Sequence, residues 1–460
     1  MSKQITTLSL GTDSLSRLLP RYAIPAIIAM TSTSLFNIVD SVFIGHGVGA
    51  LAISGMALTM PIMNVAAAFG SMVGVGAAAI TSIRLGQGNM RAAERTLGNV
   101  VLLNLFVGLA IGVLGYIFLD PILYFFGASD QTVSYAREFM HVILAGNFIT
   151  HLYLGLNEMM RASGYPQKAM YAMLTAVAVN CILNPLFIFK FGWGIRGSAL
   201  STLISQTLAM TISLRHFSNR NSFLRFRRGT LRIEPRIVKG IITIGMAPFL
   251  MNICTSIVVI FVNKSLNTYG GDLNIGAFGI INRVVMLFIM IVLGLNQGMQ
   301  PIVGYNYGAR KYHRVVKAYT ITVICAVLVT TTGFLVSRLL PEQVARLFVG
   351  GSDAHAEALV AATVYGMKYI MVMFWAVGFQ IVTGNFFQYI GKPKRAILLS
   401  MTRQMLFLVP LLILLPPRYG VTGVWIAQPI ADTMSVILAA VLLFFQMRKL
   451  LHNPDEEQSI

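Results

Sequence analysis

A succession of about twelve long apolar stretches is the feature that most constrains how this chain can fold. A helix needs about 20 mostly apolar residues to cross a bilayer, and stretches of that length recur along the whole 460-residue sequence. Hydrophobic residues make up 56% of the chain and charged residues 11%, against roughly 25% charged in an average globular protein. No soluble core of this size could bury so many apolar side chains, whereas lipid is itself an apolar solvent. The sequence therefore predicts an all-α polytopic membrane protein with spans at residues 18–44, 52–82, 97–119, 135–160, 168–190, 197–216, 238–266, 276–303, 315–340, 358–387, 396–416 and 421–447.

The distribution of basic residues indicates how the chain lies in the membrane. The net charge of +19 would also suit nucleic acid, but Lys and Arg gather in short loops between alternate apolar stretches. If both termini of the chain lie on the cytoplasmic side, the cytoplasmic loops and the two termini together hold 25 of the 35 Lys and Arg residues. Cytoplasmic loops carry such an excess. We therefore expect a multi-pass protein of the bacterial plasma (inner) membrane, with both termini cytoplasmic, surrounded by membrane lipid and not bound to nucleic acid.

Two halves of the sequence repeat each other. The segment GYPQKAM (164–170) is followed by GIRGSAL (194–200), and GKPKRAI (391–397) is followed at nearly the same distance by GVTGVWI (420–426). Upstream, two pairs of glycines with the same ten-residue gap precede basic segments in the two halves; they are Gly76 with Gly86 and Gly298 with Gly308.

This repeat predicts the domain organisation. We expect an N-terminal six-helix bundle over residues 1–217, a basic cytoplasmic linker over 218–236 and a C-terminal six-helix bundle over 237–460. Because each half has six spans, both halves enter the membrane from the same side, and the repeat is parallel. In transporters built this way, substrate binds between the two halves. Proline in several spans also suits helices that bend around a cavity, although ordinary packing kinks are equally compatible.

Asp40 is the sharpest candidate for a functional residue. A charged side chain at the centre of a membrane helix costs at least about 2.5–3.5 kcal/mol, and Asp40 lies within the first span. Asn37 precedes it by about one turn. Asn180 and Asn184 in the fifth span are four residues apart and so share a helix face. A carboxylate among amides is a candidate site for a cation or a proton; the alternative is a paired or hydrated aspartate with a packing role.

The second half has no acid at the equivalent place, where Asn263 and Lys264 occur instead. Asp432 in the last span either neutralises a nearby intramembrane cation, such as Arg283, Lys368 or Arg403, or contributes to a substrate site. Flexible Met and flat aromatic rings suit a permissive cavity for lipophilic cations, and they suit lipid-facing packing equally well. The candidates for a substrate cavity include six residues at places where polar and aromatic groups adjoin, namely Tyr153, Asn157, Met299, Gln300, Phe379 and Gln380. The intramembrane charges Asp432 and Arg283 complete the set.

Several motifs are missing from the sequence. It has no G-x-x-x-x-G-K-[ST] loop for ATP and neither an H-E-x-x-H motif nor a nucleophile elbow. Its three cysteines are far apart and lack the spacing of metal ligands. We therefore expect no enzyme activity, no metal and no cofactor, and a driving force from an ion gradient or from a partner. A flippase for lipid-linked saccharides and a membrane-embedded enzyme are the competing hypotheses.

Several long motifs resemble one known family. They are FNIVDSVFIGHGVGALAISGMAL (36–58), LGQGNMRAAERTLGN (85–99), NCILNPLFIF (180–189), GLNQGMQPIVGYNYGARKYHRV (294–315) and GVTGVWIAQPIAD (420–432). Over nearly its whole length the chain resembles the MATE (multidrug and toxic compound extrusion) transporters of the MOP superfamily, and most of all their MepA-like bacterial branch. The resemblance implies a V-shaped fold of two pseudo-symmetric six-helix bundles around a central cavity. It also implies an antiporter that exports small, lipophilic and often cationic drugs in exchange for H⁺ or Na⁺. We expect this antiporter to be a monomer.

The resemblance assigns the cation site but also marks a departure from the family pattern. The acidic residue of the family's first span matches Asp40, and its partners in the fifth span match Asn180 and Asn184. Many relatives carry Asp where this chain has Asn184, just before Pro185. A single acid favours proton coupling, because hard cations prefer several oxygen ligands including charged ones. Amide oxygens leave sodium coupling open.

Overall fold

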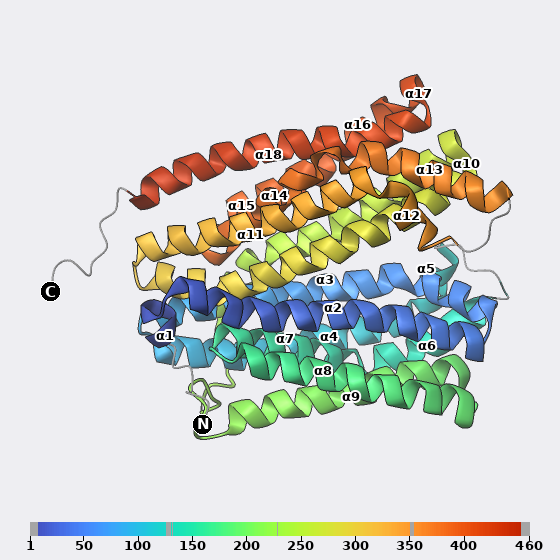
Figure 1. The fold of residues 1–460 in the computed structure, drawn as a ribbon. Coiled ribbons are helices and arrows are strands. Elements are labelled where there is room, and N and C mark those ends of the chain that lie inside the picture. Colours follow the sequence, from blue (N-terminus) through green and yellow to red (C-terminus); the bar gives the residue numbers. More distant parts are fainter. Residues whose placement is uncertain (1–7, 126–129, 131, 228, 350–353, 452–460) are drawn as a thin grey trace.

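The computed structural model describes residues 8–125, 130, 132–227, 229–349 and 354–451. Within these ranges, the side chains of residues 8, 36–39, 41, 42, 45, 50, 51, 53, 54, 57, 272, 354 and 355 lie outside the description. All regular secondary structure in the described ranges is helical. The long helices run side by side, and consecutive ones run in opposite directions (Figure 1).

The first half of the chain, up to residue 218, contains nine α-helices and one π-helix within the described ranges. They are α1 (Leu8–Thr12), α2 (Leu15–Gly47), α3 (Ala50–Gly86), α4 (Met90–Ile117), α5 (Leu119–Phe125), α6 (Val133–Ala145), α7 (Asn147–Ala162), α8 (Pro166–Pro185), the π-helix η1 (Leu186–Lys190) and α9 (Gly194–Ser218).

The second half begins with α10, in which Gly271 adopts a positive φ of 67° and separates two helical stretches. The elements are α10 (Pro235–Gly308), α11 (Tyr312–Leu339), α12 (Pro341–Arg346), α13 (Ala354–Ile370), the 3-10 turn η2 (Met371–Met373), α14 (Phe374–Tyr389), α15 (Pro393–Met401), the π-helix η3 (Thr402–Leu408), α16 (Val409–Leu414), α17 (Pro416–Tyr419) and α18 (Val421–Leu451).

The helices of the described ranges confirm the expected polytopic membrane fold. Nine of them are long and apolar enough to cross a membrane, and the pair α6 and α7, bent by 56°, makes a tenth. Two further helices, α2 with 33 residues and α9 with 25, are long enough to cross a hydrocarbon layer of about 30 Å at 1.5 Å per residue. The sequence predicted about twelve spans. The composition of α9 is more polar because one of its faces carries a series of Ser and Thr side chains.

The repeated G-x-P motif has a local structural explanation. Gly164 lies in the turn after α7 with φ of 98°, and Pro166 is the first residue of α8. In the second half, Gly391 has φ of 68° and Pro393 opens α15 in the same way. Glycine adopts positive φ without strain, and proline fits the first helical turn because its missing N–H would be unpaired there anyway.

The turns that contain Lys and Arg, or have them in the adjoining helix ends, gather at one end of the bundle (Figure 1), which we call the basic end. Because consecutive helices alternate in direction, alternate turns share an end; α1 and the last turn of α18 lie there too (Figure 1). Contacts confirm the grouping. Arg314 of α11 donates a 2.7 Å hydrogen bond to the carbonyl of Asp13, and Lys392 donates a 2.6 Å bond to Gln446 of α18. The turns of the basic end are 87–89, 163–165, 219–234, 309–311 and 390–392.

Near the basic end, the two halves approach each other closely through glycines of α3 and α10. The backbone of Gly86 lies against the carbonyl of Tyr305, and the backbone of Gly308 lies against the carbonyl of Ile83. The two contacts are copies of each other, since Gly308 follows Gly86 by 222 residues and Tyr305 follows Ile83 by the same number. Only residues without Cβ let two helix backbones approach this closely.

A second pair of contacts repeats the same relation further from the basic end. Gly76 of α3 packs on Gly245 of α10, and Gly298 of α10 packs on Ala23 of α2. Gly298 again follows Gly76 by 222 residues, and Gly245 follows Ala23 by the same number. The halves therefore meet through a two-fold pseudo-symmetric set of contacts, which we call the seam.

The segment between α9 and α10 is held against the first half. Asn99 of α4 is fully buried; its side chain donates to the carbonyl of Arg232 at 3.1 Å and accepts from the backbone N–H of Glu234 at 2.9 Å. Arg227 forms a 2.7 Å ion pair with Glu94, whose side chain is only 4% exposed. The predicted linker is thus partly docked on the basic end.

Candidate functional site

Asp40 lies on α2 and is enclosed by two helices from later in the first half. Its side chain is buried, with 9% exposure. Asn184 Nδ2 of α8 donates a hydrogen bond to Asp40 Oδ1, and Ser198 Oγ of α9 donates another to the same oxygen at 3.0 Å. Burying a carboxylate is costly unless hydrogen bonds compensate it, so these two donors explain how α2 tolerates the acid.

Asn184 contributes a second polar atom to the same place. Its side chain is fully buried, and its Oδ1 has no hydrogen-bond partner among the described residues. A buried carbonyl oxygen left unpaired is unfavourable by about 1–3 kcal/mol. Beside Asp40, this oxygen is an acceptor available to a cation or to a proton carried by the carboxyl group.

Asn180 continues the polar cluster one turn earlier on α8. Its Nδ2 donates to Thr202 Oγ1 at 3.0 Å, and its Oδ1 accepts from Ser201 Oγ at 3.0 Å. Both partners lie on α9. The two amides therefore lie on one face of α8, as their spacing predicted, and that face is held by hydroxyl groups of α9. Asp40 is the one carboxylate among these side chains.

The hydroxyl groups of α9 are the part of the site that sequence reasoning missed. Ser198, Ser201 and Thr202 occupy positions i, i+3 and i+4, which place them on one helix face. The signal was present in the sequence, but hydroxyls also bond their own helix. Ser201 Oγ and Thr202 Oγ1 both donate to the carbonyl of Ser198 as well, at 2.8 and 3.1 Å. Only the packing of α9 on α8 shows which hydroxyl groups bond a residue of another helix and which bond only their own helix.

The remaining first-half candidates lie away from Asp40 or outside the description. The side chain of Asn37 is outside the described residues. Tyr153 is buried on α7 in a small apolar cluster with Ala176 and Ala209. Asn157 ties α7 to α8, since its Nδ2 donates to the carbonyl of Ala169 at 2.8 Å.

Two second-half candidates lie at the contact between the halves. Met299 of α10 is fully buried in an apolar cluster that joins the second half to Leu18 and Tyr22 of α2. The neighbouring Gln300 is also buried, and its Nε2 donates to the carbonyl of Val75 on α3 at 3.4 Å. Both residues therefore belong to the packing near the seam.

Asp432 of α18 is paired with Arg403, one of the three cations that the sequence offered. Arg403 Nε donates to Asp432 Oδ1 at 2.9 Å, and Gln428 Nε2 donates to both carboxylate oxygens at 3.2 and 3.3 Å. The other cation named with the substrate cavity, Arg283, has an exposed side chain. The positive charge of Arg403 thus compensates Asp432, whereas the two side chains that donate to Asp40 are neutral.

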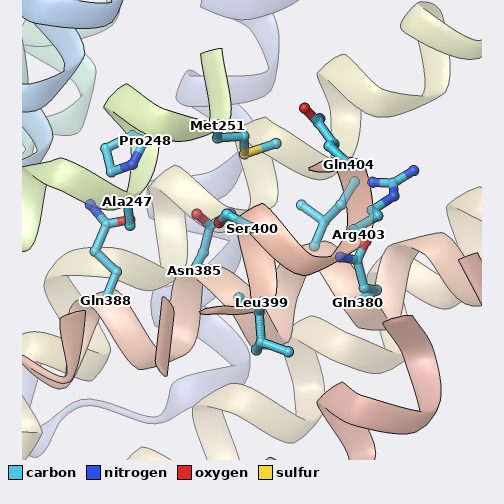
Figure 2. Close-up of a pocket in the computed structure, with 12 residues that line it drawn as sticks. Ala247, Pro248, Met251, Gln380, Asn385, Gln388, Leu399, Ser400, Arg403 and Gln404 are labelled. Atoms are coloured by element: carbon cyan, nitrogen blue, oxygen red, sulfur yellow. The ribbon is translucent and has the colours of Figure 1, made fainter. Parts of the chain in front are cut away.

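A hollow with about 50 Å³ of space accessible to water lies in the second half, between α10, α14 and the helices α15 and η3. Figure 2 shows Gln388 at one end beside Ala247 and Pro248, and Arg403 with Gln404 at the other. Gln380 lines it as well, and its Nε2 donates to Ser435 Oγ of α18 at 3.0 Å. The adjacent Phe379 is partly buried and packs on the core of the second half instead.

In the described part of the chain, twelve long helical spans in two halves, with the buried Asp40 in one and a polar hollow in the other, define a polytopic membrane transporter. A family model described as MatE matches residues 25–186 and 244–414, which is more than half of the chain. The chain therefore belongs to the MATE family of membrane transporters, and it is a transporter and not an enzyme.

Characterised relatives are similar over almost the full length. The multidrug export protein MepA of Staphylococcus haemolyticus is 26% identical over 432 residues, which is 94% of each chain. MepA of Staphylococcus aureus (strain MSSA476) is 26% identical over 434 residues, or 93% of each chain.

Solved structures share the fold. The outward-facing conformation of a multidrug resistance MATE family transporter of the MOP superfamily superposes with a TM-score of 0.90 at 24% identity, covering 98% of this chain and 100% of that one. A MATE transporter in its bent conformation also gives a TM-score of 0.90, covering 97% and 99%. The expected all-helical MATE-type fold is therefore confirmed.

Proposed function

We propose that this protein is a secondary active multidrug efflux transporter, which exports lipophilic and cationic organic compounds by antiport with protons, or with sodium. The full-length similarity to proteins named multidrug export protein MepA supports the substrate class. The buried Asp40, held by neutral donors, is the observation that supports ion coupling in the first half.

The partners of Asp40 favour a proton as the coupling ion. When Asp40 is ionised, it accepts from Asn184 Nδ2 and Ser198 Oγ. When it is protonated, the carboxyl group becomes a donor, and a rotated Asn184 amide offers its oxygen, which is otherwise unpaired among the described residues. An aspartate at position 184 would lack this exchange and would instead add a second negative charge. Hence Asn184 suits a carboxyl group that changes protonation state.

The arrangement of the halves supports alternating access. We assign the basic end to the cytoplasm because of its excess of Lys and Arg, which places both termini there. The seam brings the halves together near that end through backbone contacts. In this conformation the cytoplasmic side is the closed side, and the opposite state requires the seam to separate. Ion and drug are then coupled through opposite preferences for the two states.

Proteoliposomes loaded with a fluorescent lipophilic cation, with proton and sodium gradients imposed separately, test the proposal. We expect the proton gradient to drive transport, and Asp40→Asn to abolish the gradient-driven component. The double variant Arg403→Gln/Asp432→Asn is the matched control, because it removes the buried aspartate of α18 together with the cation that neutralises it.

Two results would contradict the proposal. If Asp40→Asn responds to the gradient as the wild type does, Asp40 is not the coupling site. If neither gradient drives transport in the wild type, antiport itself is wrong, and a lipid-linked saccharide flippase becomes the better hypothesis.

A further inference from the structure

The hollow of the second half carries chemistry opposite to that of the Asp40 site. Arg403 is the only ionisable residue among the described side chains that line it, and Asp432 does not line it. Within the buried ion pair, the Arg403 side chain is 17% exposed and that of Asp432 only 5%. The accessible partner of this pair is therefore the guanidinium group.

Arg403 keeps donors for a ligand. Its Nε is used by Asp432, and among the described residues no hydrogen bond engages its two terminal nitrogens. These nitrogens form the planar edge that matches a carboxylate with two parallel hydrogen bonds. Arg403 lies in the π-helix η3, and π-helical turns within α-helices frequently occur at functional sites.

Gln388 supplies a donor at the other end of the hollow (Figure 2). Its side chain is 2% exposed, and its Nε2 has no hydrogen-bond partner among the described residues. An unpaired buried amide N–H is unfavourable, so this group is best explained by an acceptor that occupies the hollow. Gln380, beside Arg403, is eight residues away on the same helix, which corresponds to roughly 12 Å between the two ends.

The wall between the two ends is largely apolar. Met251 of α10, Ile381 of α14 and Leu399 of α15 supply its apolar part, and Asn385 and Ser400 add two uncharged polar groups (Figure 2). The same stretch of α10 also meets the first half, where Phe249 packs edge-to-face on Phe69 of α3 at a centroid distance of 4.9 Å. Only α10 therefore separates a ligand in the hollow from this contact, which would change if the two halves move relative to each other during transport.

We propose that this hollow binds an elongated amphiphile, with a carboxylate or similar anionic group on Arg403, an uncharged acceptor on Gln388 and an apolar body between them. The inference rests on the proposed transport function and extends it, because it assigns acidic and zwitterionic amphiphiles to the second half while cations are coupled in the first. Two sources share this chemistry, namely exported organic acids and anionic lipid headgroups.

Equilibrium binding to the purified full-length protein tests the proposal without any ion gradient. The probes are 11-(dansylamino)undecanoic acid, whose fluorescence rises in an apolar site, and its methyl ester, which lacks the charge. We expect the wild type to bind the acid roughly tenfold more tightly than the ester, since hydrogen bonds to charged groups are the stronger ones.

Two variants test the two ends of the hollow separately, and a third is the control. The double variant Arg403→Gln/Asp432→Asn replaces the ion pair with amides of similar volume, and it should remove the preference for the acid while leaving ester binding unchanged. Gln388→Leu should weaken acid and ester alike. Asn296→Leu removes a buried amide of α10 that, among the described residues, bonds only its own helix, and it should change neither affinity.

Competition distinguishes the two sources. Acid binding is measured in nanodiscs of phosphatidylcholine alone and in nanodiscs that also contain phosphatidylglycerol. Displacement by phosphatidylglycerol in the wild type, but not in the double variant, identifies a lipid headgroup as the occupant; lack of displacement identifies a free organic acid.

Equal affinity of the wild type for acid and ester, or an unchanged preference in the double variant, overturns the proposal. Because no gradient is applied, this failure is separate from a failure of antiport. A protein that pumps cations through Asp40 but does not distinguish acid from ester contradicts this inference alone.

Discussion

Substituting Gly308 by alanine should shift the protein away from the conformation described above. A Cβ at Gly308 would lie 2.9 Å from the carbonyl carbon of Ile83 and closer still to its oxygen, whereas ordinary contact begins at 3.4 Å. Both partners are helix backbone, so no side chain can rotate away. The two helices must therefore separate by about 1 Å, and such overpacking typically costs about 1–3 kcal/mol.

This cost applies only to the state in which the seam is closed. If the seam opens during transport, Gly308→Ala favours the open state by about five- to 150-fold. Gly279→Ala is the matched control, because it lies on the same helix and a Cβ there meets no atom within 4 Å. Both substitutions gain the same helix propensity.

Cysteine labelling measures the shift. Ser82 is fully buried and packs against Gly304 in the seam. Ser82→Cys, in a background without Cys181, Cys254 and Cys325, reports opening through its rate of reaction with a maleimide. We expect Gly308→Ala to increase this rate at least fivefold over Gly279→Ala. Equal rates in the two variants would refute the argument that a closed glycine seam limits access from the basic end.

Three further predictions concern individual contacts. Ser198→Ala removes a donor to Asp40 and should weaken proton-driven transport by roughly tenfold, whereas Ser205→Ala, whose hydroxyl bonds only its own helix, should not; equal effects in liposome assays would exclude this role. Arg403→Gln alone should destabilise the protein by about 3–5 kcal/mol because it leaves Asp432 buried without a cation, and adding Asp432→Asn should restore part of the loss; additive losses in thermal unfolding would contradict the pairing. Asn99→Ala should release the segment before α10 and speed trypsin cleavage there, whereas Asn89→Ala, which removes only the cap of α4, should leave the rate unchanged.

The sequence alone determined the architecture, because apolar length, charge distribution and the repeat are one-dimensional signals. Apolar runs of about 20 residues dictate spans wherever they occur. The spacing of Asn180 and Asn184 sufficed to place both amides on one face, and Asp40 was recognisable because an acid within an apolar span is costly.

The tertiary structure decided which polar groups meet. Ser198 could not be told from the other hydroxyls of its helix until α9 packed on α8. Three cations were available to Asp432, and only the packing of η3 against α18 selected Arg403. The unpaired donor of Gln388 became visible only from the packing around it, which leaves its Nε2 buried and without a hydrogen-bond partner among the described residues. Helix periodicity fixes the face on which a side chain lies, but the partner across that face depends on contacts between segments far apart in the chain.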